Sequence, residues 1–371
     1  MTPRFHAPEL VVVKIGSNSL RAADGGLDGD VVVELVDQLA KLVRGGTNAV
    51  LVSSGAVAAG LAPLGMRTRP PDLPGLQAAA SVGQGLLLHR YQAAFAAHGL
   101  ACGQVLLMAA DMVDRRRYLN ARNTFERLLA LGAVPLVNEN DTVATEELRV
   151  GDNDRLAALV AGMLGADLLV LLSDVDGLYE HAPATDRTAR PLDRVDDPAL
   201  IDRLQIGDTT SGVGTGGMVT KLDAARIATL GAAHVVIAHA RRPAVLDAVV
   251  GGAAVGTWFP ARDRPHSRKL WIAFATAPQG SLIIDGGAVR ALVDRGSSLL
   301  PVGITDVLGD FHDGVSVNVI GPDEQLVARG LVSFDAAEIR AMAGRPTGEL
   351  DPARRRAVVH RDSLVVLAQP G

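Results

Sequence analysis

The chain contains a single cysteine, Cys102, among its 371 residues. One cysteine cannot form an internal disulfide, so a small secreted fold held by disulfides is excluded and a reducing compartment is expected. Because Cys102 falls in a strand-like apolar run, we interpret it as a small buried residue rather than as a nucleophile.

Long apolar runs and an excess of basic residues are also missing. The most apolar segment, 166–175, is interrupted by Asp167 and Asp174, and no run approaches the ~20 residues that span a bilayer. The first residues, MTPRFH, lack the apolar stretch of a signal peptide. The formal net charge of −5 does not indicate nucleic acid or an anionic membrane as a partner. We therefore expect a soluble, cytoplasmic protein without membrane contact.

What the chain does have is the composition and length of a globular protein with more than one domain. Hydrophobic residues make up 48% and charged residues 21%, which is enough apolar material for a sizeable core. A single domain typically has roughly 100–200 residues, so a chain of this length predicts two domains.

Short, continuous runs of Val, Ile and Leu alternate with helical patterns over the first 260 residues. Continuous runs are typical of strands in a parallel sheet that is covered on both faces. The clearest helical pattern, over 32–43, spaces its apolar residues along one face and is followed by Gly45-Gly46. The alternation predicts an α/β fold, an α/β/α sandwich around a mainly parallel sheet. The predicted strands are 11–15, 49–52, 104–107, 134–137, 168–172 and 235–237.

The pattern changes near residue 260, where a charged, Pro-bearing stretch without periodicity begins. We predict a first domain over 1–262, a linker over 263–277 and a small, mostly β domain over 278–371. Within the second domain, we predict one short helix around 288–295 and strands at 281–284, 315–320, 327–332 and 364–367.

Ligands of such sheets bind at the carboxyl ends of the strands, so the residues that follow each run are the candidates for a site. The first strand ends in Lys14 and Gly16, and this lysine is either a phosphate ligand or an ordinary surface lysine. The second strand runs into the small residues 53–60, SSGAVAAG. A helix that starts there would offer unpaired N–H groups to an anion, although the segment also reads as a tight turn.

Two clusters of Asn and Asp follow the fourth strand, at 138–142 and 151–156. Such residues are costly to bury unless they bind something, and carboxylates and amides suit the three donors of an ammonium group. The alternative is that Asn153 or Asp154 caps the next helix. After the fifth strand, Ser173 and Asp174 are placed to contact a nucleotide, although Asp176-Gly177 is also a common turn.

The glycine-rich segment 211–221, SGVGTGGMVTK, formally matches the dinucleotide-binding pattern. No buried strand precedes it and no acidic residue lies ~20 positions beyond it, so we reject that interpretation. It is not a Walker A loop either, because Lys221 does not follow a glycine at the required spacing. A loop of N–H groups that runs into a helix carrying Lys221 would cradle phosphates, and a flexible linker is the alternative.

The nine histidines show no metal-ligand spacing and no H-E-x-x-H motif, so we predict no metal held by the protein itself.

Taken together and in order, these motifs resemble the bacterial glutamate 5-kinases of the amino acid kinase superfamily, with a last domain similar to PUA domains. Each motif is weak alone, whereas the ordered set covers nearly the whole chain. The matching segments are 13–17 (VKIGS), 53–60 (SSGAVAAG), 118–124 (YLNARNT), 138–141 (NEND), 150–154 (VGDND), 214–221 (GTGGMVTK) and 296–301 (GSSLLP).

The resemblance implies transfer of the γ-phosphoryl group of Mg-ATP to the side-chain carboxylate of L-glutamate, the first step towards proline. It implies that Lys14 and Lys221 stabilise the transferred group and that Asp154 orients them. The glutamate-binding residues would be Ser54, Asp141 and Asn153, with Asn138 and Asp152 nearby. The ATP-binding residues would be Lys14, Ser173, Asp174, Thr215, Gly216, Gly217, Met218, Val219, Thr220 and Lys221. The cofactors would be ATP and Mg²⁺, and the family also implies a homo-oligomer and feedback inhibition by proline.

Other functions remain open at this point. PUA domains commonly bind RNA, but residues 280–371 hold nine arginines, no lysine and twelve acidic residues, a balance of 9 − 12 = −3. Phosphate contacts need clustered positive charge, and only Arg354-Arg355-Arg356 supplies it, so RNA is not favoured as a partner. The alternatives are a related kinase with another acceptor, an RNA-binding protein with an inert kinase fold, and a regulatory amino-acid sensor.

Overall fold

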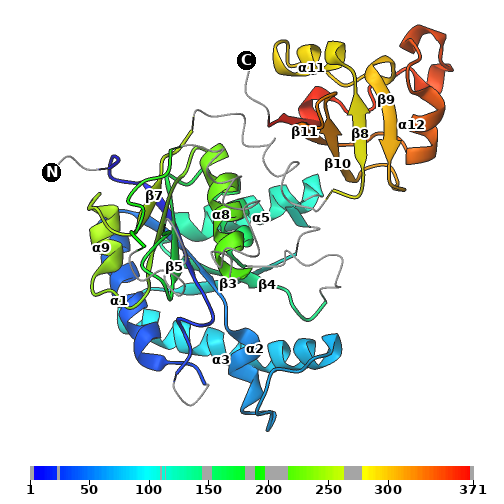
Figure 1. Cartoon of the computed structure of the whole chain (residues 1–371). Helices are drawn as coiled ribbons and strands as arrows, with labels where there is room; N and C mark the ends of the chain where they lie inside the picture. The colour runs from blue at the N-terminus through cyan, green and yellow to red at the C-terminus, as the bar shows by residue number, and fades with distance from the viewer. Residues whose placement is uncertain are drawn as a thin grey trace. The chain divides into compact units, whose positions relative to one another are not determined.

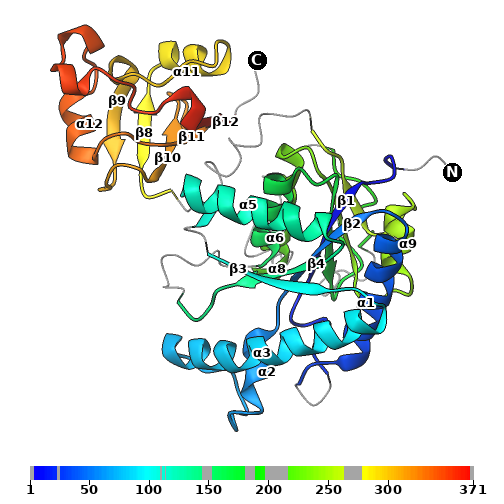
Figure 2. The ribbon, with the colours of Figure 1, turned by 180° about the vertical axis from the view of Figure 1, so that it is seen from behind.

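The chain divides into two compact units, Met1–Pro265 and His266–Gly371, which are described here one at a time (Figures 1 and 2). The structure is a computed structural model, and it describes residues 4–22, 26–108, 111–112, 114–143, 153–179, 189–196, 216–262 and 278–367. The predicted linker, 263–277, lies outside the described residues.

The first unit is built on a sheet of seven described strands in the order β3-β4-β2-β1-β5-β6-β7. All neighbouring strands run parallel except β7, which is antiparallel to β6. The six strands predicted from the sequence are confirmed, and the three-residue β7 was not predicted. The strands are β1 Leu10–Ile15, β2 Asn48–Ser53, β3 Cys102–Leu107, β4 Val134–Glu139, β5 Leu168–Ser173, β6 His234–His239 and β7 Thr257–Phe259.

Helices cover both faces of this sheet, which confirms the predicted α/β/α sandwich (Figures 1 and 2). One layer contains α1 (Gly29–Arg44), α3 (Leu73–Ala97) and α9 (Val245–Val250), and the short α2 (Ala56–Leu61) packs against α3. The other layer contains α5 (Arg115–Ala130), α6 (Asn153–Leu164) and α8 (Gly216–Leu230).

Side chains of β1 alternate between these two layers, as they must in a strand. Val11, Val13 and Ile15 belong to the core formed with α1, α3 and α9. Lys14 therefore points to the opposite face, where α6 and α8 lie. The same alternation on β4 places Val134 and Leu136 in the α3 core, and Asn138, two residues further on, shares their face. The face of the sheet to which each side chain points, which alternates along a strand, thus decides which polar groups can meet at the sheet edge.

The predicted helix over 32–43 is confirmed as part of α1, whose buried residues include Val32, Leu35, Val36 and Leu39. The Asp28 side chain accepts hydrogen bonds from the N–H groups of Asp30 and Val31 and so caps the start of the helix. Gly46, just past the end, has φ 93°, a left-handed conformation that favours glycine.

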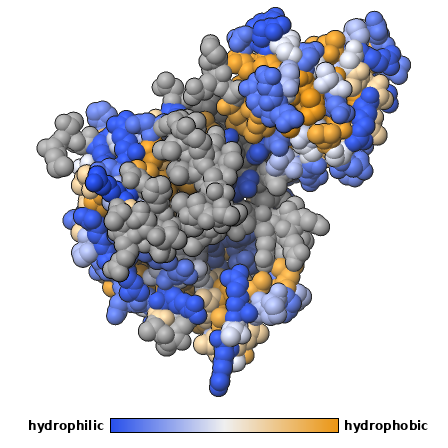
Figure 3. All heavy atoms as spheres, viewed as in Figure 1, coloured by the Kyte–Doolittle hydropathy of each residue, from blue (hydrophilic) through white to orange (hydrophobic). Residues whose placement is uncertain are grey.

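The second unit has its own sheet, in the order β12-β11-β10-β8-β9, and its own hydrophobic core. The prediction of a mostly β domain with a helix near 288–295 is confirmed, whereas β9 and α12 were not predicted. Apolar side chains reach the surface of this unit next to its first helix (Figure 3), where Leu300 is 40% and Val302 47% exposed. The elements are β8 Ser281–Ile284, α11 Gly286–Val293, β9 Ile304–Leu308, β10 Ser316–Ile320, β11 Leu326–Leu331, α12 Ala336–Met342 and β12 Leu364–Val366.

The arginine cluster of the second unit is engaged in contacts within the unit. Arg355 donates to the Leu350 carbonyl (2.8 Å), and Arg356 donates to the Ser333 carbonyl (2.8 Å) while its guanidinium lies 4.5 Å from the centre of the Phe334 ring. These contacts give the cluster a structural role. Separately, none of the helices in the described ranges combines the length and the apolar character needed to cross a membrane.

Candidate functional site

The carboxyl edge of the sheet around β1 is where the polar groups of the first unit gather. β1 pairs with β2 on one side and with β5 on the other, so the chain leaves these strands in different directions. Such a switch point opens a crevice at the carboxyl ends of the strands. The residues that follow β1, β2, β4 and β5 all meet there.

Two lysines that are far apart in the sequence share one carboxylate at this edge. Lys14 Nζ lies 2.5 Å from Asp154 Oδ1, and Lys221 Nζ lies 3.0 Å from Asp154 Oδ2. Asp154 is fully buried, and the two lysines are 3% and 8% exposed. Asp154 thus brings two ammonium groups together in a site shielded from water, where their charge acts strongly on an anion.

The first turn of α8 holds Lys221 in position. Its ammonium donates to the carbonyl of Gly217 (3.2 Å) as well as to Asp154, and Thr220 donates to Asp154 Oδ2 (3.2 Å). Of the predicted nucleotide-binding residues, Gly216 to Lys221 thus form the start of a helix beside the lysines. Thr215 lies outside the described residues.

Ser173 and Asp174 occupy the end of β5 on the same edge. Ser173 Oγ donates to Asp174 Oδ1 (3.1 Å), and Asn18 Nδ2, from the loop after β1, donates to Asp174 Oδ2 (3.3 Å). Partial burial disfavours the charged form of Asp174. The hydrogen bonds from Ser173, its own backbone N–H and Asn18, with the charge of Lys221, outweigh burial and lower the pKa of the carboxyl. An ionised carboxylate therefore stands beside the lysines.

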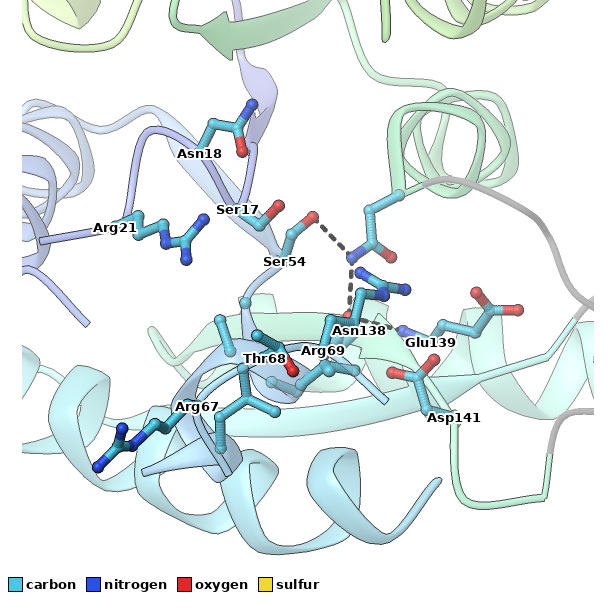
Figure 4. A pocket seen from close by; sticks show the side chains of 16 residues that line it. Ser17, Asn18, Arg21, Ser54, Arg67, Thr68, Arg69, Asn138, Glu139 and Asp141 are labelled. Atoms are coloured by element: carbon cyan, nitrogen blue, oxygen red, sulfur yellow. Dashed lines mark hydrogen bonds between the residues drawn. The ribbon is translucent and has the colours of Figure 1, made fainter. Parts of the chain in front are cut away.

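A pocket of about 310 Å³ opens between the ends of β1, β2 and β4 (Figure 4). Four of the predicted glutamate-binding residues line it, namely Ser54, Asn138, Asp141 and Asn153. The fifth, Asp152, lies outside the described residues. The structure therefore brings the described members of the predicted set together around one cavity.

A hydrogen-bonded group of amides and hydroxyls forms the floor of this pocket. Asn153, the first residue of α6, donates through Nδ2 to Ser54 Oγ (2.9 Å) and to Asn138 Oδ1 (2.8 Å). Asn153 Oδ1 is buried and has no hydrogen-bond partner among the described residues. A buried acceptor without a partner is costly, so this oxygen is suited to receive a donor from a ligand.

Comparison with known proteins agrees with this geometry. Residues 9–239 match the amino acid kinase family, and residues 280–351 match the PUA domain. The glutamate 5-kinase of Streptomyces avermitilis is 55% identical over 96% of both chains. The glutamate 5-kinase of Frankia casuarinae is 53% identical over 99% of both chains. The chain belongs to the glutamate 5-kinase family.

Sequence reasoning missed the cationic wall of the pocket in this member of the glutamate 5-kinase family. Arg21, Arg67 and Arg69 line the cavity. In Figure 4 the guanidinium of Arg21 points into the pocket, Arg69 lies beside Asn138, and Arg67 points away. All three arginines lie in loops without periodicity, so the signal in the sequence was limited to the pair of arginines at 67 and 69, a few residues beyond the small-residue segment.

Proposed function

We propose that the chain transfers the γ-phosphoryl group of ATP to the side-chain carboxylate of L-glutamate and forms glutamyl 5-phosphate, the first step of proline biosynthesis. The observation that carries this proposal is the contact of both Asp154 oxygens with the ammonium groups of Lys14 and Lys221. Family membership supports the identity of the substrates.

The chemistry needs positive charge more than it needs a base. A side-chain carboxylate with an ordinary pKa of ~4.3 is already ionised at neutral pH, so no proton has to be removed. Its oxygen forms a bond to the γ-phosphorus, the bond from that phosphorus to the β–γ bridging oxygen breaks, and ADP leaves with the electron pair. The repulsion between the two anions is the main obstacle, and positioning with charge stabilisation overcomes it.

The two lysines are placed for that task. Lys14 lies near the end of the central strand β1 and Lys221 lies near the start of α8, so the two side chains approach the transferred group from different elements. We propose that they stabilise the charge on the phosphoryl oxygens and that Asp154 holds both amines in place. Asp154 itself would remain an unprotonated positioning group.

The pocket beside the lysines suits glutamate by charge. We propose that Asp141 and the unpaired oxygen of Asn153 accept hydrogen bonds from the ammonium group, with Asp152 and Asn138 nearby. Ser54 and the guanidiniums of Arg21 and Arg69 would then bind the carboxylates. Glutamate carries two carboxylates and one ammonium group, which matches a cavity that presents these two arginines together with acidic and amide groups.

The nucleotide would lie across the ends of β5 and α8. We propose that Ser173, Asp174 and the stretch from Thr215 to Lys221 bind ATP, with Lys14 reaching its phosphates. Mg²⁺ would enter with the nucleotide, held by the residues proposed for ATP, and would supply positive charge that offsets the charge of the phosphates. Among the described residues, no group of three or more metal-binding side chains gathers.

Several properties rest on family membership alone. A homo-oligomer and feedback inhibition by proline are carried over as proposals, and a cytoplasmic location remains a prediction from the sequence. RNA is not proposed as a partner, because the one arginine cluster of the second unit is used in contacts within that unit.

The test is glutamate-dependent release of ADP. We expect ADP release with glutamate but not with aspartate, acetylglutamate or a nucleoside monophosphate, measured in a coupled assay. Lys14→Ala and Lys221→Ala are each expected to lower kcat by about a hundredfold or more, because each removes a charge that stabilises the transition state.

Lys41→Ala is the matched control, since Lys41 lies on α1 and its side chain is 69% exposed. It should leave kcat unchanged. Normal turnover in Lys14→Ala or Lys221→Ala would remove that lysine's assigned role. Faster ADP release with another acceptor would replace glutamate as the substrate.

A further inference from the structure

A glutamine from α3 lies behind the floor of the pocket and is bonded to it. Gln84 Oε1 accepts a hydrogen bond from Asn138 Nδ2 at 2.6 Å. Gln84 is half-buried and does not line the cavity itself. It is the next link behind Asn138, which in turn contacts Asn153.

Backbone partners show which atom of each asparagine amide donates and which accepts. The N–H of Glu139 donates to Asn138 Oδ1 (2.9 Å), and an N–H can only donate, so this oxygen must be the acceptor. The Ser53 carbonyl accepts from Asn153 Nδ2 (3.4 Å), and a carbonyl can only accept. Asn138 therefore donates through its NH₂ group to Gln84, and Gln84 accepts through its side-chain oxygen.

The orientation matters because it decides which atoms face a ligand. The NH₂ group of Asn153 donates to Ser54 Oγ, Asn138 Oδ1 and the Ser53 carbonyl, so the side-chain oxygen of Asn153 remains as an acceptor for a ligand. Ser54 Oγ accepts from Asn153, which leaves the hydroxyl hydrogen to be donated. The pocket thus offers an acceptor to an ammonium group and a donor to a carboxylate. Without Gln84, Asn138 would keep the N–H of Glu139 but lose the partner of its NH₂ group, so this polarity would be held less firmly.

The position of Gln84 is itself held by close helix packing. At the preceding residue, Gly83, an added Cβ would lie 1.8 Å from the carbonyl oxygen of Ala56, so α3 is pressed against α2 at this point. This close packing fixes α3 at the residue before Gln84 and keeps Gln84 within reach of Asn138 on β4.

We propose that Gln84 is a positioning residue for the amino-acid substrate: by accepting from Asn138 Nδ2 it reinforces the orientation that the N–H of Glu139 gives to the Asn138 amide, and through Asn138 it steadies the contact to Asn153 and the polarity of the pocket. This inference rests on the proposed function, because it assigns the substrate's ammonium group and a carboxylate to those atoms. Gln84 itself does not touch the substrate.

Gln84→Met keeps the length of the side chain and removes the acceptor. We expect it to raise the KM for glutamate on the order of tenfold, as the loss of one buried hydrogen bond and its orientation would do. The KM for ATP and the kcat at saturating glutamate should change little. Gln84→Glu keeps an acceptor oxygen and should lie closer to the unmodified chain than Gln84→Met. Gln92→Met, on the exposed side of the same helix, is the matched control and should have no effect.

A double-mutant cycle separates positioning from packing. Asn138→Ala already removes the donor, so adding Gln84→Met to it should raise the KM for glutamate no further. Additive effects, an unchanged KM in Gln84→Met, or equal rises in the KM of glutamate and ATP would each overturn the proposal. Gln84→Ala, which removes the same oxygen and favours the helix, gives the same comparison if Gln84→Met folds poorly.

The unmodified chain separates this proposal from the proposed function. If it releases no ADP in response to glutamate, the proposed function fails before any variant is compared. If it does, and the cycle shows no coupling, only the role of Gln84 fails.

Discussion

At the scale of single residues, one buried carboxylate between two lysines dominates the site. Asp154 is fully buried, and both of its oxygens are engaged by ammonium groups. Removing charges from water costs more than most ion pairs return, so such a cluster is weak support for stability. A carboxylate that brings two ammonium groups together beside a polar pocket is better explained by the chemistry on an anion proposed above.

A pH-dependent effect is expected from Asp174. Hydrogen bonds and the charge of Lys221 lower the pKa of this carboxyl despite its partial burial. The folded pKa then lies below the unfolded value of ~3.9, so the unfolded state takes up the proton first. Ionisation of Asp174 therefore contributes stability that is fully present above the unfolded pKa. This contribution is lost as the pH falls through the folded pKa. Asp174→Asn should therefore cost more unfolding free energy at about pH 6 than at about pH 3.

Urea unfolding at the two pH values measures this difference directly. Asp176→Asn provides the control, because Asp176 lies on the same turn, is exposed and makes no hydrogen bond or ion pair with the described part of the chain. A cost of Asp174→Asn that was the same at both pH values would contradict the assigned hydrogen bonds.

At the scale of elements, the contact between α2 and α3 holds one wall of the pocket. Added Cβ atoms would lie 1.9 Å from the carbonyl oxygen of Ala79 at Gly60, and 1.8 Å from that of Ala56 at Gly83. Only glycines allow two helix backbones to approach so closely. Because α2 begins two residues after Ser54, the helix contact also fixes the residues that line the cavity.

Gly83→Ala should therefore harm both stability and substrate binding. The new methyl group would overlap backbone atoms of α2, which cannot turn aside as a flexible side chain could. We therefore expect a loss of roughly 2–3 kcal/mol of unfolding free energy and a higher KM for glutamate. Gly85→Ala, two residues along the same helix, meets nothing within 4 Å. It should instead stabilise the chain by about 0.5–1 kcal/mol. Thermal unfolding and glutamate kinetics of the two variants provide the comparison, and equal stabilities would contradict the close packing.

The elements that the sequence predicted share a physical property. Five of the six parallel strands are buried at nearly every position and so appear as apolar runs, whereas the edge strand β3 is only partly buried. α1 is buried on one face, so its apolar residues follow the helical period. The elements that were missed lack such a signal. β7 has three residues, and β9, beside a turn of 3₁₀ helix, has only two buried residues separated by two exposed ones. Short or half-exposed segments are defined by their neighbours rather than by their own pattern.

At the scale of the whole molecule, every described residue named at the site belongs to the first unit. The last of them is Lys221, and the second unit has a separate sheet and core. A chain that ends at residue 262 should therefore keep most of the kcat and an unchanged KM for glutamate, measured by ADP release. A folded fragment with little activity would assign the second unit a part in catalysis.

The composition of the site could be predicted only in part from the sequence. Lys14, Asp154 and Lys221 follow strands or open helices, where the parallel-sheet pattern directs attention. The distance between them depends on strand order and on side-chain parity, which no local pattern encodes. The arginines of the pocket wall and Gln84 were missed for a related reason. The arginines lie in irregular loops, and Gln84 is one polar residue within a long apolar helix.

Asn153 and Asp154 are neighbours in the first turn of α6, yet Asn153 lines the pocket and Asp154 contacts the two lysines. Successive residues of a helix point about 100° apart, so a single rigid turn reaches into both compartments. A ligand that displaces the Asn153 amide would therefore also shift the Asp154 carboxylate and the two lysine ammonium groups that contact it. A ligand in the proposed amino-acid pocket would thus disturb phosphoryl transfer through the first turn of α6 alone, without a conformational change elsewhere in the protein.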